Sequence, residues 1–291
     1  MTVRSDDGAR TECRLKGQFR IKGLRSTNPV AIGDRVEFDK QPDEDTGIIS
    51  IIAKRDNYMI RKAINLSKDS HIIAANLDHA FLIVTLARPK TSTGFIDRFL
   101  VTATGYYIPA SIIFNKIDLY DEALSNYEVK LKTIYEHAGY PCYSVSALRG
   151  NHVGEISALL KDKTSLFAGH SGAGKSALIT AIQPDLKLKT GSISEVHLKG
   201  KHTTTFAEMF ELTKGGFIID TPGIREFGLI DFENKEISRC FPEMERLLPQ
   251  CRYKNCTHTH EPGCAVKNGL ETGEVSSMRY NSYLSILNDK S

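Results

Sequence analysis

The first part of the chain carries short apolar runs separated by glycine and charged residues. Ile and Val recur in the segments QFRIKGL, GDRVEF and DTGIISIIAKR, all between residues 11 and 60. Brief, glycine-punctuated runs of β-branched residues are typical of strands joined by tight turns. We therefore predict a small β-barrel domain over residues 1–67.

Residues 68–228 follow a second pattern, in which apolar strands alternate with helical segments. The predicted strands lie in HAFLIVTLA, ASIIFNKID, PCYSVSA, TSLFAG and GGFIID. The predicted helices lie in GFIDRFLVTATGYY, EALSNYEVKLKTIYEHAGY, VGEISALLK and KSALITAI. This alternation predicts an α/β sheet that is covered by helices on both faces.

The strand pattern stops near residue 229. Pro242, Pro249 and Pro262 separate short helical pieces. Apolar residues at helical spacing in VSSMRYNSYLSILND predict a terminal helix. We therefore expect a multidomain protein that ends in a small helical domain over residues 229–291.

The composition agrees with a globular protein, since 41% of the 291 residues are hydrophobic and 25% are charged. No apolar run reaches the roughly 18 residues of a membrane span, and the polar first residues lack the apolar core of a signal peptide. We expect a cytoplasmic protein with no membrane partner. Residues 1–68 carry a net charge of about +4, which fits either RNA contact or an ordinary solvated surface.

The segment GHSGAGKS (169–176) matches the phosphate-binding loop, or P-loop, between a predicted strand and a predicted helix. Its glycines allow backbone N–H groups to turn toward phosphate oxygens. Lys175 is expected to contact the terminal phosphates and Ser176 to bind Mg²⁺. A chance glycine-rich turn is the alternative. The predicted phosphate-site residues are Gly169, His170, Ser171, Gly172, Ala173, Gly174, Lys175, Ser176 and Ala177.

Two downstream segments supply the other residues that a nucleotide hydrolase needs near its terminal phosphate. In DTPG (220–223), Asp220 is expected to support Mg²⁺ and the Gly223 N–H to contact the γ-phosphate. In KHTTT (201–205), we take Thr204 as the residue that reaches Mg²⁺, with Thr203 and Thr205 as alternatives. A polar strand edge is the structural alternative for this segment.

The segment NKID (115–118) predicts guanine recognition. The Asp118 carboxylate can accept hydrogen bonds from the imino and amino groups of guanine, a donor pair that adenine lacks. Asn115 would hold the loop, and the stem of Lys116 would pack on the ring. Ser146 and Ala147 of SVSA, which also follow a predicted strand, supply a second loop beside the base.

The order of these segments is rotated, because the base-reading pair precedes the P-loop. The simplest explanation is a circularly permuted GTPase. In this order the chain passes directly from DTPG into a cysteine-rich region, so we hypothesise that hydrolysis repositions the C-terminal domain. Ile224 follows DTPG where a water-orienting glutamine is common, which predicts slow intrinsic turnover. His202 is the candidate replacement, and an exposed loop histidine is the alternative.

Three cysteines lie close together in CRYKNCTHTHEPGC (251–264). Three thiolates and one imidazole would make a closed tetrahedral zinc site, with His258 and His260 as rival fourth ligands. The other cysteines, Cys13, Cys142 and Cys240, are expected to be plain buried thiols.

The combination of motifs resembles the RsgA/YjeQ family, circularly permuted GTPases of small ribosomal subunit biogenesis. The resemblance rests on NKID, SVSALRG, GHSGAGKS, KHTTT, DTPGIREFGL and CRYKNCTHTHEPGC, and on GDRVEF and GIISIIAKRDNYMIRK near the N-terminus. It implies an N-terminal OB-fold, a central permuted G domain and a C-terminal zinc domain. It assigns the zinc ligands to Cys251, Cys256, His258 and Cys264. Ala173 and Ala177 depart from the family, which often has Val and Thr there.

The resemblance also implies a function. Family members bind GTP or GDP with Mg²⁺, hydrolyse GTP under stimulation by the 30S subunit, contact its rRNA and leave after hydrolysis. We expect the same of this chain, as a monomer. Two alternatives stay open: an RNA-binding clamp gated by nucleotide with negligible turnover, and a P-loop kinase or ATPase, against which Asp118 argues.

Overall fold

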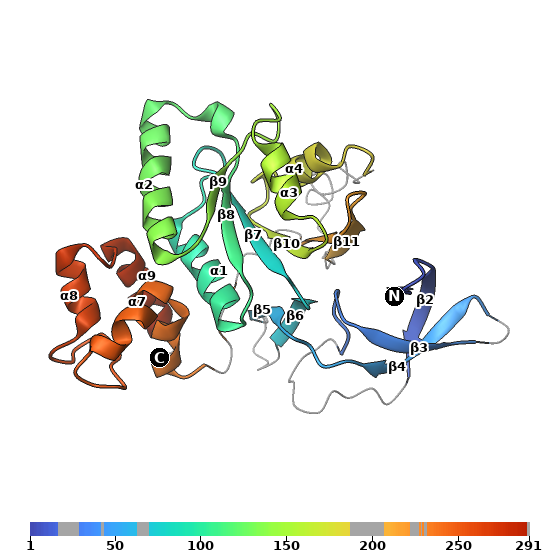
Figure 1. The fold of residues 1–291 in the computed structure, drawn as a ribbon, viewed down its shortest axis with the longest axis horizontal. Helices are drawn as coiled ribbons and strands as arrows, with labels where there is room; N and C mark the ends of the chain where they lie inside the picture. The colour runs from blue at the N-terminus through green and yellow to red at the C-terminus, as the bar shows by residue number, and fades with distance from the viewer. Residues whose placement is uncertain are drawn as a thin grey trace, which may run out of the picture.

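The computed structural model describes residues 1–16, 29–41, 44–62, 70–186, 207–221, 227, 229 and 232–289. These residues form a small N-terminal sheet, a large central sheet flanked by helices, and a helical C-terminal region (Figure 1). The C-terminal helices lie beside α1 and α2 of the central region, while the N-terminal strands lie at the opposite end of the molecule.

The N-terminal sheet confirms the predicted β domain and forms a half-barrel. Its strands are β1 (Thr2–Arg4), β2 (Arg10–Leu15), β4 (Thr46–Ile52) and β3 (Val36–Lys40), in that spatial order. A Cβ on Gly47 would lie 2.6 Å from the Phe38 ring and 2.9 Å from Cys13 Sγ, so the ring can cross β4 only at a glycine. The predicted strand QFRIKGL (18–24) lies outside the described residues.

A pair of strands that the sequence analysis did not separate links this sheet to the central region. Strands β5 (Tyr58–Lys62) and β6 (Ser70–Ala75) pair antiparallel. Met59 and Ile72 are buried in the central hydrophobic core, and the Tyr58 ring lies 4.9 Å from that of Tyr106. Strand β5 therefore packs with the central core, although it precedes the domain boundary predicted at residue 67.

The central sheet has six strands in the order β11-β12-β10-β7-β8-β9 within the described residues. Their bounds are β7 (His79–Val84), β8 (Ala110–Phe114), β9 (Cys142–Ser144), β10 (Thr164–Ala168), β11 (Glu208–Glu211) and β12 (Phe217–Asp220). All neighbouring pairs are parallel except β11–β12. The P-loop follows β10, at the centre of the sheet, where nucleotide sites of open α/β sheets lie.

Helices cover both faces of the central sheet, as predicted (Figure 1). They are α1 (Thr93–Gly105), α2 (Glu122–Ala138), α3 (Val153–Leu159) and α4 (Lys175–Ile182). Successive residues of β7 point to opposite faces. Leu82 and Val84 join the core under α1 and α2, whereas Phe81 and Ile83 join the core under α3 and α4. The continuous apolar run of β7 follows from this double burial.

The regular elements described from residue 232 onward are all helices, and the loop over residues 251–264 lies between them. The elements are α6 (Asn234–Ile237), η3 (Ser238–Cys240), α7 (Pro242–Leu247), η4 (Leu248–Gln250), α8 (Ala265–Thr272) and α9 (Ser277–Asn288). Helix α9 packs on α1, and α7 packs on α2. Arg246 of α7 donates to the carbonyl of His137 at 3.0 Å, close to the end of α2. The predicted C-terminal helical domain is thus confirmed and docked on the central domain.

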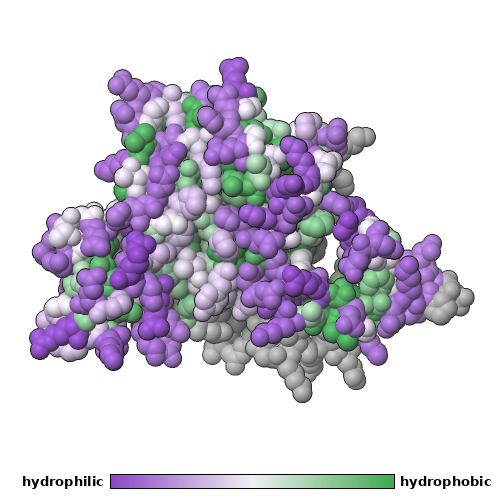
Figure 2. All heavy atoms as spheres, viewed as in Figure 1, coloured by the Kyte–Doolittle hydropathy of each residue, from purple (hydrophilic) through white to green (hydrophobic). Residues whose placement is uncertain are grey.

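The face seen in Figure 2 is mainly hydrophilic, with small apolar groups scattered among polar residues. Single exposed apolar residues, such as Val129 and Tyr107, are ordinary on protein surfaces. None of the described helices has the length and apolarity needed to cross a bilayer.

Candidate functional site: a guanine-nucleotide site and a cysteine-histidine cluster

The P-loop turns between β10 and α4 at positions that only glycine can occupy. A Cβ on Gly169 would lie 2.3 Å from the carbonyl oxygen of Ile83, and a Cβ on Gly174 would lie 2.4 Å from Asn115 Nδ2. Gly172 and Gly174 also have positive φ angles of 80° and 92°. Lys175 Nζ donates to the Gly169 carbonyl at 2.8 Å, so the ammonium group lies inside the loop.

Asn115 joins three loops that are far apart in sequence. Its side chain is buried, and its Nδ2 donates to the Ala173 carbonyl of the P-loop at 3.0 Å. Its Oδ1 accepts from the backbone N–H of Ala147 at 3.1 Å and from that of Lys116 at 2.8 Å. One amide therefore fixes NKID, SVSA and the P-loop relative to one another.

The carboxylate of Asp118 is exposed and held in place by Ser146. The Ser146 hydroxyl donates to Asp118 Oδ1 and accepts from the backbone N–H of Arg149 at 3.1 Å. Lys116 has a left-handed φ of 65°, and its Nζ donates to the carbonyls of Gly172 at 2.6 Å and Arg88 at 2.8 Å. The sequence-predicted base-reading residues thus lie together, next to the P-loop.

Asp220 ends β12 beside the P-loop. Its Oδ1 is buried and has no hydrogen-bond partner among the described residues. Burial raises the pKa of Asp220 and lowers that of Lys175, and the opposite charge of each residue works against both shifts. A buried carboxylate oxygen without a partner, close to Lys175 of the P-loop, suits Mg²⁺, which prefers oxygen ligands and keeps several waters.

Several predicted residues fall outside the described part of the chain. These are His202, the three threonines Thr203, Thr204 and Thr205, Gly223 and Ile224. Their predicted roles stay predictions.

The structure brings Cys251, Cys256, His258 and Cys264 together, with one potential ligand atom from each within 4.8 Å of all the others. His258 Nδ1 lies 3.3 Å from Cys264 Sγ and 3.7 Å from Cys251 Sγ. His260 is exposed, and its Nδ1 lies 3.0 Å from the Thr259 hydroxyl. Burial raises the pKa of Cys256 to about 12, and a thiolate at this position needs a positive charge beside it. Three sulfurs and one imidazole are a donor set that suits zinc.

Residues around the cluster that the sequence analysis missed hold its loop. The Glu261 carboxylate accepts from the backbone N–H groups of Thr257 at 2.7 Å, Thr259 at 3.1 Å and His260 at 3.2 Å. Burial opposes its ionisation, but the Thr257 hydroxyl and the backbone N–H groups of Thr257 and Thr259 help to lower the pKa of Glu261 to about 2. Tyr280 of α9 donates to the His258 carbonyl at 2.7 Å. The sequence signal for this role was Glu261 itself, an acidic residue between the candidate ligands His258 and Cys264.

The other three cysteines lie outside this cluster. Cys13, Cys142 and Cys240 are buried, and none of them forms a disulfide within the described part of the chain. Burial raises the pKa of Cys142 to about 12, so this thiol is protonated at neutral pH. The prediction that they are plain buried thiols is confirmed.

Comparisons with known proteins agree with this geometry. The RsgA GTPase family model matches residues 52–230, and the RsgA N-terminal domain model matches residues 2–49. The protein of Bacteroides fragilis named small ribosomal subunit biogenesis GTPase RsgA is 54% identical over 288 residues, covering 99% of this chain and 93% of the relative. A protein of the same name from Flavobacterium psychrophilum is 51% identical, covering 98% of this chain and 88% of the relative.

Two solved structures are also similar. YjeQ from Thermotoga maritima has a TM-score of 0.77 and 36% identity, over 99% of this chain and 93% of that chain. YloQ, described as a circularly permuted GTPase, has a TM-score of 0.72 and 29% identity, over 98% of this chain and 88% of that chain. The predicted permuted fold and GTP hydrolysis are thereby confirmed. The chain belongs to the RsgA GTPase family.

Proposed function

We propose that this GTPase acts in biogenesis of the small ribosomal subunit, as the names of its relatives indicate for those proteins, and that its step belongs to late maturation. It binds the 30S subunit and its rRNA, is stimulated by that subunit and leaves after hydrolysis. It works in the cytoplasm as a monomer of three units: an OB-fold RNA-binding unit (1–67), a permuted G domain (68–228) and a zinc unit (229–291).

The observation that carries the nucleotide part is the joining of NKID, SVSA and the P-loop through Asn115. We propose that Asp118 and Ser146 read guanine and that Lys175 contacts the terminal phosphates. Ser176 and Asp220 would hold Mg²⁺, which neutralises phosphate charge when bound. Cys251, Cys256, His258 and Cys264 would hold one structural Zn²⁺.

Adding purified 30S subunits should raise the multiple-turnover rate of GTP hydrolysis at least about tenfold, because Ile224 cannot orient water and a partner must complete the site. Phosphate release with and without subunits measures this effect. Large 50S subunits serve as the matched control. An equal rate with both particles, or with neither, would refute stimulation by the small subunit and leave a nucleotide-gated clamp as the better account.

Replacing His202 by alanine should lower the 30S-stimulated rate by about 100-fold while changing GDP affinity less than about twofold, since we propose that its imidazole orients the attacking water. Replacement of His152, a histidine on a different loop of the central domain, is the control. Stimulated turnover at the wild-type rate in the His202 variant would remove this residue from the mechanism.

A further inference from the structure

Helix α1 contacts the P-loop with its first turn. The ring of Phe95 stacks on that of His170, with centroids 3.9 Å apart and planes inclined by 27°. Phe95 and Phe99 also contact Phe227, a few residues beyond DTPG, with centroid distances of 5.6 Å and 5.1 Å. These phenylalanine side chains are buried, so the start of α1 is packed between the phosphate site and the segment that follows it.

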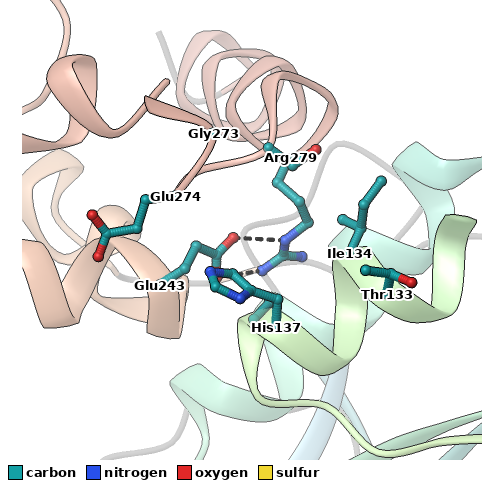
Figure 3. Close-up of a pocket in the computed structure, with 9 residues that line it drawn as sticks. Thr133, Ile134, His137, Glu243, Gly273, Glu274 and Arg279 are labelled. Carbon is teal, nitrogen blue, oxygen red and sulfur yellow. Dashed lines mark hydrogen bonds and ion pairs between the residues drawn. The ribbon is translucent and has the colours of Figure 1, made fainter. Parts of the chain in front are cut away.

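The same helix carries a buried ion pair to the C-terminal domain. Asp97 Oδ1 accepts from an Arg279 terminal nitrogen at 2.7 Å, and Glu243 of α7 accepts two further bonds from Arg279 at 2.7 Å and 3.1 Å. Figure 3 shows the two bonds between Glu243 and Arg279. Arg279, Asp97 and Glu243 expose 1%, 0% and 4% of their surface, so removing one partner leaves a buried charge without compensation.

Three aromatic rings enclose the Arg279 guanidinium group. Its carbon lies 4.7 Å from the centre of the Phe241 ring, 5.5 Å from that of Tyr140 and 5.7 Å from that of Tyr135. Tyr135 belongs to α2 and Tyr140 follows it, whereas Phe241 precedes α7. Arg279 of α9 therefore lies in a site formed by residues of both the central and the C-terminal domain. We call the three rings of Tyr135, Tyr140 and Phe241 the socket of Arg279.

The α2 side of this junction is more open. A cavity of about 190 Å³ lies there, lined by His137 and Thr133 of α2 and by Glu274 and Ser276 before α9 (Figure 3). Glu243 and Arg279 form part of its wall. Both α1 and α2 contact the C-terminal domain, and the bond between Asp97 and Arg279 is a buried polar contact on the α1 side.

We propose that Arg279 is a positioning residue for the nucleotide site, acting through Asp97 and helix α1 on Phe95 and the P-loop. Asp97 lies two residues after Phe95 on one continuous helix, so a shift of the ion pair moves the ring that supports His170. This route runs through packed side chains and not along the backbone after DTPG, although Phe227 of that segment packs against Phe95 and Phe99. It rests on the nucleotide site proposed above. Because coupling is reciprocal, nucleotide binding tightens domain docking by the same factor.

The test uses the zinc-loaded full chain and the variant Asp97→Asn. Asparagine has nearly the same shape, and Arg279 keeps its bonds to Glu243. We expect GDP to dissociate about threefold to tenfold faster, the range of couplings that travel through packed networks, and amides of residues 169–176 to exchange faster. Fluorescent GDP release and hydrogen-exchange mass spectrometry measure the two effects.

Arg98→Gln is the matched control. Arg98 neighbours Asp97 on α1 and pairs with Asp289, which follows α9, but Arg98 is half-exposed and Asp289 is exposed. Ion pairs at the surface contribute little to stability, so the rate of GDP release in Arg98→Gln should stay within about twofold of wild type. Equal effects of Asp97→Asn and Arg98→Gln would overturn the proposal.

A second comparison separates positioning from simple loss of stability. In a Phe95→Leu background the ring stack is absent, so Asp97→Asn should add no further change in GDP release. Additive effects would overturn the proposal, as would a lower melting temperature with wild-type GDP release. If Asp97→Asn does not fold, Glu243→Gln is judged by the same criteria. Wild-type protein that binds no GDP would instead refute the nucleotide site itself.

Discussion

Replacing Asp118 by asparagine should weaken GTP and GDP binding by at least about 100-fold and create affinity for xanthosine nucleotides. The carboxylate is positioned by the Ser146 hydroxyl and exposed toward the site, so it can accept from both guanine donors. An asparagine amide presents one donor and one acceptor. It mismatches the amino group of guanine and complements the additional carbonyl of xanthine.

Titration of fluorescent GDP and xanthosine diphosphate (XDP) against the wild-type protein and Asp118→Asn measures this switch. Asp121→Asn is the matched control: Asp121 lies three residues further along and caps α2 by accepting from the backbone N–H of Leu124 at 2.8 Å. Asparagine is an equally good cap, so GDP affinity should not change. If Asp118→Asn loses GDP without gaining XDP, the residue supports the loop and does not read the base. If it binds GDP normally, guanine is read elsewhere.

The nucleotide loops were predictable because local backbone rules dictate their residues. A P-loop needs glycine where Gly169 approaches the Ile83 carbonyl and where Gly174 approaches Asn115, and these needs leave a readable sequence pattern. The rotated order of NKID and the P-loop then predicted the permuted fold. The role of Asn115 in joining three loops was only partly predicted, because its partner Ala173 lies 58 residues away.

The elements that were missed lack such local patterns. Strand β2 buries only Thr11 and Cys13, so it shows no alternation of large apolar residues. Arg279, in its socket, bonds to residues that are 182 and 36 positions away, and a single arginine in a helical pattern looks like any solvated residue. Contacts of this kind follow from the docking of domains, which no short pattern encodes.

Replacing His258 by alanine should release zinc and unfold the cysteine-containing loop, whereas His260→Ala should leave both unchanged. His258 Nδ1 faces the Sγ atoms of Cys251 and Cys264, while His260 is exposed beside Thr259. Loss of one of four ligands should weaken zinc binding by at least about 100-fold. The loop should unfold as well, because the free energy of metal binding is what folds small metal modules. Elemental analysis and thermal melting measure the two outcomes.

Two comparisons sharpen this zinc prediction. Cys240→Ala removes a buried thiol of the same domain that lies outside the cluster, so it should keep stoichiometric zinc. Zinc should also dissociate more readily as the pH falls, because protons compete for thiolates and burial raises the pKa of Cys256 in the metal-free cluster to about 12. Equal zinc content in His258→Ala and His260→Ala would show that imidazole is not a ligand. Zinc lost only from His260→Ala would mean that the 258–260 turn rearranges around the metal, and Glu261, which binds three backbone N–H groups there, would then have to release them.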